Sequence, residues 1–145
     1  MSDISDRKLP RLFWVVAIIA LAWNAMGVAA YLMQVTISNE AIAALPAEQQ
    51  ALYAAQPAWV TAAFAIAVFA GMAGSVALVL RKRVATTMFV VSLLAAVGQM
   101  FYAFAMSNML DVMGADSAVM PVAIIVIAGA LVWFALRARD EGWTN

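Results

Sequence analysis

The sequence predicts an all-α integral membrane protein, an antiparallel bundle of four transmembrane helices with both termini in the cytoplasm. Three observations support this fold class. The 145-residue chain is 67% hydrophobic and 11% charged, whereas a soluble domain carries about 25% charged residues. Four uncharged apolar segments are each long enough to cross a bilayer about 30 Å thick, which needs about 20 helical residues. The basic residues also cluster in alternate connecting segments.

The four membrane segments are expected at about residues 12–33, 58–80, 84–106 and 119–136 of a single membrane domain, 1–145. Helices are predicted because a helix pairs its backbone groups within one segment, as the hydrocarbon interior requires. The alternation of apolar and polar residues that a transmembrane strand needs is not seen in these segments. The first apolar run is longer than the core of a signal peptide, which has about 7–15 residues, so we expect it to remain a helix.

The distribution of charge predicts the orientation. The loop between the first two segments carries only the acidic residues Glu40 and Glu48, and the loop between the last two carries only Asp111 and Asp116. Because Lys and Arg favour the cytoplasmic side of the membrane, the N- and C-termini are expected in the cytoplasm. All eight basic residues then lie on that side: Arg7, Lys8, Arg11, Arg81, Lys82, Arg83, Arg137 and Arg139.

Residues 34–57 are predicted to form an outer loop with a short interfacial helix. Pro46 suits a first-turn position, and Glu48 would lie near the positive end of the helix dipole. Leu45, Leu52 and Tyr53 are expected to face the bilayer or the bundle. The sequence leaves open whether this helix is a connector or a lid.

Four polar side chains fall in the predicted outer half of the bilayer: Asn24 and Tyr31 in the first segment, and Gln99 and Tyr102 in the third. A rise of about 1.5 Å per residue gives these depths, because both segments run in the same direction. In a structural interpretation, Asn24 and Gln99 hydrogen-bond across the bundle, each bond contributing about 0.6 kcal/mol. In a functional one, all four residues bind a neutral polar solute, such as a sugar, in an outward-opening cavity.

Small residues recur in the second segment, where Ala67, Gly71 and Ser75 are four residues apart and Gly74 lies in a neighbouring row. This spacing lets helix backbones approach closely in lipid. The four residues are therefore predicted to form a helix-packing interface. The interface lies either inside the bundle or, in the alternative, between copies of a homo-oligomer.

Catalytic and metal-binding patterns are missing from the sequence. The chain has no Cys and no His, and we find neither a buried carboxylate pair nor a base beside a serine. We therefore expect no enzymatic activity, no cofactor, no metal site and no nucleic-acid partner. Met106, Met109 and Met113 are expected to pack flexibly rather than to bind copper. Proton-coupled transport is disfavoured because no membrane segment contains an ionisable carboxylate or amine.

The stretches "LAWNAMGVAAYLMQ", "PAEQQALYAAQPAW" and "SNMLDVMG" resemble a family of small bacterial four-helix inner-membrane proteins, commonly labelled sugar transporters or hypothetical. The resemblance covers about residues 10–138 and implies a location in the bacterial inner (cytoplasmic) membrane. The chain departs from the family at Ala30, where members often have an acidic residue, and at Met109, where they often have Gly. The first departure weakens any ion-coupled mechanism, and the second argues against a shared copper site.

The sequence is compatible with two functions. We expect a non-enzymatic inner-membrane protein, either a small oligomeric transporter-like protein for a neutral polar solute such as a sugar, or an accessory or assembly subunit that packs against a larger membrane protein complex. The first would purify as a homo-oligomer in lipid or detergent. The second would purify with unrelated partners.

Overall fold

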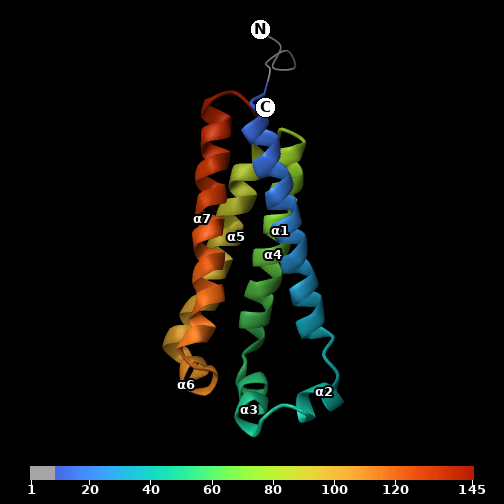
Figure 1. Cartoon of the computed structure of the whole chain (residues 1–145), viewed down its shortest axis with the longest axis vertical. Coiled ribbons are helices and arrows are strands. Elements are labelled where there is room, and N and C mark those ends of the chain that lie inside the picture. The colour runs from blue at the N-terminus through green and yellow to red at the C-terminus, as the bar shows by residue number, and fades with distance from the viewer. Residues whose placement is uncertain (1–8) are drawn as a thin grey trace.

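The computed structural model describes residues 9–145, and all the regular structure in that range is helical. Arg7 and Lys8 lie outside the described residues. Four long elements within this range are apolar enough to cross a membrane: α1, α4, α5 with the π-helix that continues it, and α7 with the short helix before it. The elements, in chain order (Figure 1), are α1 (Arg11–Val35), α2 (Asn39–Ala43), α3 (Ala47–Ala55), α4 (Ala58–Val79), α5 (Val84–Phe101), the π-helix η2 (Tyr102–Met106), α6 (Met109–Met113), the 3₁₀-helix η3 (Ala115–Ala118) and α7 (Val119–Asp140).

The predicted number of long apolar helices is confirmed, and their bounds differ from the expected ones by a few residues. One difference is at α7, which was predicted to stop at Leu136 and continues to Asp140. Arg137 and Arg139 lie in its last turn. Basic side chains there interact favourably with the negative end of the helix dipole, so the helix extends beyond its apolar part.

The four long helices pack in a simple order. Helix α1 packs on α4, α4 on α5, and α5 on α7. The short connection "RKR" joins α4 and α5 as an antiparallel hairpin. Its turn contains Arg81 in the left-handed region, with φ of 58°. The α4–α5 turn and the C-terminus lie at one end of the molecule, and α2, α3 and α6 at the other (Figure 1).

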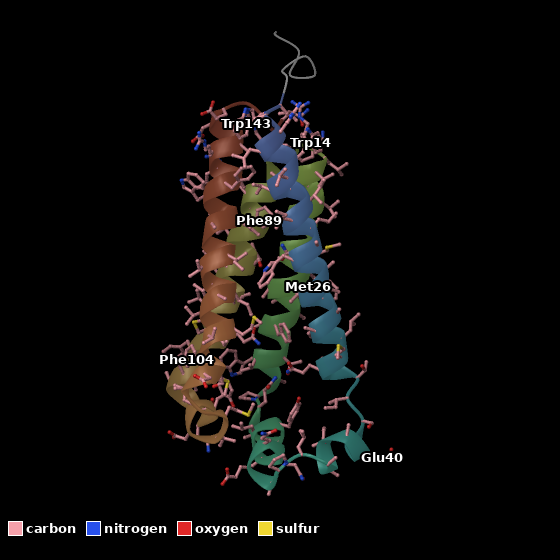
Figure 2. The ribbon with its side chains drawn as sticks, viewed as in Figure 1. Trp14, Met26, Glu40, Phe89, Phe104 and Trp143 are labelled. Carbon is pink, nitrogen blue, oxygen red and sulfur yellow. The ribbon has the colours of Figure 1, made fainter. Side chains whose placement is uncertain are left out.

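The two ends differ in charge. We call one the basic end, because it carries Arg11, the α4–α5 turn and the last turn of α7. The opposite end, with the loops that carry Glu40, Glu48, Asp111 and Asp116, is called the acidic end. Figure 2 shows Trp14 and Trp143 at the first and Glu40 at the second.

The best-packed part of the core lies toward the basic end. Phe13 of α1 and Phe134 of α7 are buried there, with ring centroids 6.1 Å apart, and Trp143 packs edge-on against Phe13 at 6.0 Å. The C-terminal segment is paired with the α4–α5 turn: the amide of Arg83 donates to Asn145 O at 2.9 Å, and the amide of Asn145 donates to Arg81 O at 2.7 Å. From this closed end, α1 and α7 diverge toward the acidic end (Figure 1).

The outer loop contains two short helices where one was predicted. Ser38 caps α2 by accepting a hydrogen bond from the amide of Ala41 at 3.1 Å. Pro46 separates α2 from α3 because proline disfavours a helical conformation at the residue before it and has no N–H of its own. Gln50 fixes the turn between them, since its Nε2 donates to Leu45 O at 2.7 Å and to Ala43 O at 3.2 Å.

Candidate functional site

Asn24 lies against α4, not α5. Its Nδ2 donates to Ser75 Oγ at 2.9 Å and to the carbonyl of Ala20, one turn earlier in α1, also at 2.9 Å. Ser75 is fully buried, and its hydroxyl in turn donates to Gly71 O at 3.0 Å. The expected pairing of Asn24 with Gln99 is therefore wrong, because both amide hydrogens of Asn24 are already used and α1 packs on α4.

The row of small residues on α4 is covered by helices of the same chain. A Cβ at Gly71 would fall on Oδ1 of Asn24 and lie 3.1 Å from Oγ of Ser92 in α5. A Cβ at Gly74 would lie 2.9 Å from ring carbons of Phe89, also in α5. All four residues of the predicted interface, Ala67, Gly71, Gly74 and Ser75, are buried.

The row thus lets both α1 and α5 approach α4 closely. Ser92 completes the contact by donating its hydroxyl proton to Ala67 O at 2.6 Å. The alternative, in which these residues form a self-association face, is wrong because α1 and α5 already occupy that face within one chain. A homo-oligomer would have to use another surface.

Tyr31 also belongs to the contact between α1 and α4. Its ring packs edge-on against Phe64 at 5.4 Å and against Phe69 at 5.7 Å. The four candidate binding residues therefore divide into two pairs. Asn24 and Tyr31 fix α1 on α4, whereas Gln99 and Tyr102 line a cavity elsewhere.

That cavity opens at the acidic end and has a volume of about 450 Å³. The end of α1, the helices α3, α4, α5 and α6, and the π-helix all contribute to its walls. Among the described residues that line it, none is an Asp, Glu, Lys or Arg. They are Gln34, Leu45, Gln49, Leu52, Tyr53, Gln56, Val60, Gln99, Tyr102, Ala103, Ser107, Met109 and Met113.

The polar groups of this acidic-end cavity are mainly carboxamides. Gln56 donates from Nε2 to Thr61 Oγ1 at 2.9 Å. The side chains of Gln34, Gln49 and Gln99 are half-buried and, within residues 9–145, form no hydrogen bond to another protein group. Each therefore offers an N–H₂ donor and a carbonyl acceptor to water or to a bound molecule.

The π-helix shapes one wall of the cavity. Its wider turn is closed by the bond from the amide of Ser107 to Tyr102 O, at 3.0 Å, and it places Tyr102, Ala103 and Ser107 in the lining. The Tyr102 hydroxyl donates to the carbonyl of Ala55 at 3.2 Å, which connects the π-helix to the end of α3. Short π segments are often found at functional sites.

Three of the cavity glutamines, Gln34, Gln49 and Gln56, were not predicted from the sequence, because they lie in or beside a polar loop. A signal was nevertheless present in the outer loop. Gln49, Leu52, Tyr53 and Gln56 follow the spacing i, i+3, i+4 and i+7, which places them on one face of a helix. Leu52 and Tyr53, together with Leu45, had been expected to face the bilayer or the bundle, and they face the cavity.

Comparison with models of protein families, with curated proteins and with solved structures finds no match to this chain. Function is therefore inferred from the chemistry of the acidic-end cavity. Its uncharged donors and acceptors suit a neutral molecule with several hydroxyl or amide groups. An ionic molecule would lose hydration there without gaining an opposite charge in return.

Proposed function

We propose that this chain is a non-enzymatic protein of the bacterial inner membrane that binds a neutral polar solute, such as a sugar, in its acidic-end cavity. The four long apolar helices support the membrane location. The separation of basic and acidic residues supports an orientation with the basic end, and hence both termini, in the cytoplasm. In this orientation the cavity opens to the outside of the cell.

The observation that carries the proposal is the set of unpaired carboxamides in a cavity without charged walls. Gln34 comes from α1, Gln49 from α3 and Gln99 from α5, so the three groups reach the same space from different directions. Convergent polar groups in an otherwise apolar pocket fix the orientation of a small ligand. A site of this kind favours a ligand with hydroxyl groups, because a ligand without them covers the half-buried amides and leaves them unpaired.

Solute exchange takes place at the acidic end in this conformation. Toward the basic end, the bundle is filled by Phe13, Leu78, Phe89 and Phe134. A transporter-like cycle would require these side chains to separate. We therefore propose that one chain alone binds the solute. Transport across the membrane would also require the helices to rearrange at the basic end.

Thermal melting of the purified chain in detergent, with a panel of neutral sugars and their acidic and amino derivatives, tests the proposal. At a ligand concentration 100 times Kd, binding should add about 2.7 kcal/mol to the stability. At the same ligand concentration, Gln99→Leu should reduce this ligand effect to about 0.3–1.8 kcal/mol and change the stability of the free protein little. Asn24→Leu is the matched control, since it should lower the stability of the free protein and keep the ligand effect.

Two results would contradict solute binding. One is the lack of any ligand effect across the neutral sugars, and the other is a ligand effect of the same size in Gln99→Leu as in the wild-type chain. A protein that shows no sugar effect and is recovered from its native membrane in a fixed ratio with an unrelated membrane protein would instead support the accessory-subunit alternative.

A further inference from the structure

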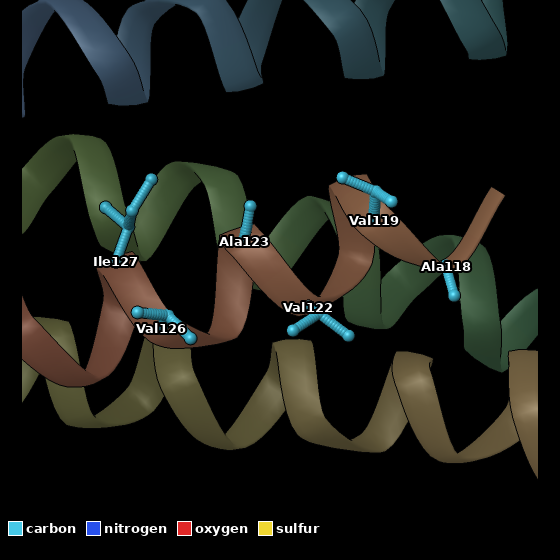
Figure 3. Close-up of a pocket in the computed structure, with 6 residues that line it drawn as sticks. All are labelled: Ala118, Val119, Val122, Ala123, Val126 and Ile127. Carbon is cyan, nitrogen blue, oxygen red and sulfur yellow. The ribbon is translucent and has the colours of Figure 1, made fainter. Parts of the chain in front are cut away.

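A second hollow runs along α7 and is distinct in chemistry from the acidic-end cavity. It is an open groove of about 500 Å³ on the half of the helix nearest the acidic end. Val119 and Val126 in its lining are 69% and 64% exposed, so no other part of the described chain covers them. Figure 3 shows the lining residues, all apolar: Ala118, Val119, Val122, Ala123, Val126 and Ile127.

The length of the α7 groove corresponds to one leaflet of a bilayer. From Ala118 to Ile127, a rise of about 1.5 Å per residue gives about 14 Å. The hydrocarbon interior is about 30 Å thick, so one leaflet occupies about half of it. The groove does not continue along α7, because Leu131 and Phe134 are buried in the core that closes the basic end.

We propose that the α7 groove binds one acyl chain of a phospholipid from the leaflet at the acidic end, and that this lipid has an ammonium-bearing zwitterionic headgroup. The inference rests on the proposed membrane location. It does not depend on solute binding in the acidic-end cavity, which has other walls.

The length of the groove favours an acyl chain over a helix from a second copy. A transmembrane helix crosses both leaflets. An acyl chain ends within one leaflet, as the groove does. It also requires no hydrogen-bonding partner, and the lining residues offer no polar side chain.

The charges beside the groove favour an ammonium headgroup. Asp116 is exposed in η3, two residues before the groove begins, and Asp111 is exposed in α6. The sequence contains no Lys or Arg between residues 84 and 136. An anionic headgroup would therefore meet acidic side chains without a basic partner, whereas an ammonium group within the Debye length of about 8 Å would be attracted.

Photo-crosslinking in nanodiscs tests the acyl-chain assignment. The probe is a phosphatidylethanolamine with a diazirine in its acyl chain, in nanodiscs made of equal parts phosphatidylethanolamine and phosphatidylglycerol. The wild-type chain should crosslink within residues 118–127 at least fivefold more than at Met26 or Met33, which are exposed on the acidic-end half of α1. Equal crosslinking of α7 and α1 in the wild-type chain would overturn the proposal.

Two substitutions on neighbouring residues sharpen the test. Ala123→Phe fills the groove and should reduce crosslinking at α7 at least fivefold. Ile124→Phe adds a ring on the same turn but outside the lining, and should leave crosslinking unchanged. Equal effects of the two would overturn the proposal, as would a crosslinked dimer joined through α7, because a second copy would then occupy the groove.

Native mass spectrometry of the same nanodiscs tests the headgroup. Lipid retained by the wild-type chain should be enriched at least threefold in phosphatidylethanolamine over phosphatidylglycerol. Asp116→Lys should abolish or reverse this enrichment. Wild-type retention of both lipids in equal amounts, or enrichment unchanged by Asp116→Lys, would overturn the assignment of the headgroup.

Discussion

Gly71→Ala is expected to destabilise the bundle because one methyl group would occupy the position of the Asn24 carboxamide. A Cβ at Gly71 would fall on Asn24 Oδ1 and lie 3.1 Å from both Asn24 Cγ and Ser92 Oγ. Asn24 would have to rotate, and its bond of 2.9 Å to Ser75 would be lost. The substitution therefore perturbs the contacts of α4 with both α1 and α5.

The expected change combines two unfavourable contributions and one favourable contribution. Overpacking costs about 1–3 kcal/mol, and loss of an interhelical hydrogen bond adds about 0.6 kcal/mol. Replacing Gly by Ala inside a helix also contributes a gain of about 1 kcal/mol. Gly98→Ala provides that gain without a clash, since a Cβ there would meet nothing within 4 Å. The difference between the two variants should thus be about 1.6–3.6 kcal/mol.

Unfolding in mixed micelles of detergent and sodium dodecyl sulphate measures this difference in stability. The decisive comparison is the cost of Gly71→Ala in the wild-type chain and in the Asn24→Ala variant. With the carboxamide removed, only the contact with Ser92 remains, so the cost of Gly71→Ala should fall by at least about 1 kcal/mol. An equal cost in both backgrounds would refute the packing described for Gly71. If Gly71→Ala changed the elution mass and left the stability unchanged, Gly71 would instead belong to an interface between copies.

Three further predictions concern other parts of the molecule. Gly74→Ala should lower the free energy of unfolding by about 1–3 kcal/mol relative to Gly98→Ala in the same assay, because its Cβ would lie 2.9 Å from a phenylalanine ring; equal stabilities would show that the ring moves freely. Tyr102→Phe removes the hydrogen bond to the end of α3, so amide exchange in α3 should become about twofold to tenfold faster, the range that corresponds to 0.5–1.5 kcal/mol, and unchanged exchange would argue against this connection. A cysteine at Glu48 should react with an impermeant maleimide on intact cells and one at Lys82 should not; the reverse pattern would invert the proposed orientation.

The long helices could be predicted because one physical requirement dominates them. A membrane segment must be apolar, about 20 residues long and internally hydrogen-bonded, and each of these properties is visible in the sequence. The close approach of helices at Gly71 and Gly74 was also visible as spacing. The sequence did not indicate which helices approach there. The same small residues are required whether the helix that packs on them belongs to the same chain or to another copy.

The partner of Asn24 could not be predicted from depth. Gln99 lies in a helix that runs in the same direction, but the α5 residue at the level of Asn24 is Ser92, two turns before Gln99. Because α1 packs on α4, Ser75 lies within reach of Asn24. Ser75 had been interpreted only as a small residue, although a buried hydroxyl is an obvious partner for a carboxamide.

The acidic-end cavity depends on long-range arrangement, which local patterns do not record. It forms where α3 packs near α6 across the end of the bundle, and the ends of α1, α4 and α5 complete its walls. Gln99 and Tyr102 were identified as candidates because polar side chains in a membrane segment are conspicuous. Gln34, Gln49 and Gln56 belong to or border a polar loop, where glutamine is ordinary.

Isothermal titration calorimetry of the purified chain with the neutral sugar that stabilises it best is the most direct test of solute binding in the acidic-end cavity. We predict one site per chain and a Kd that changes less than twofold between pH 5 and 8 and between 50 and 500 mM NaCl, because no Asp, Glu, His, Lys or Arg is among the described lining residues. Gln99→Leu should weaken binding by about fivefold to 150-fold, which corresponds to the 1–3 kcal/mol cost of an unpaired buried hydroxyl. Tighter binding of a charged derivative, a Kd that rises steeply with salt, or equal affinity in Gln99→Leu would contradict binding of a neutral solute at this site.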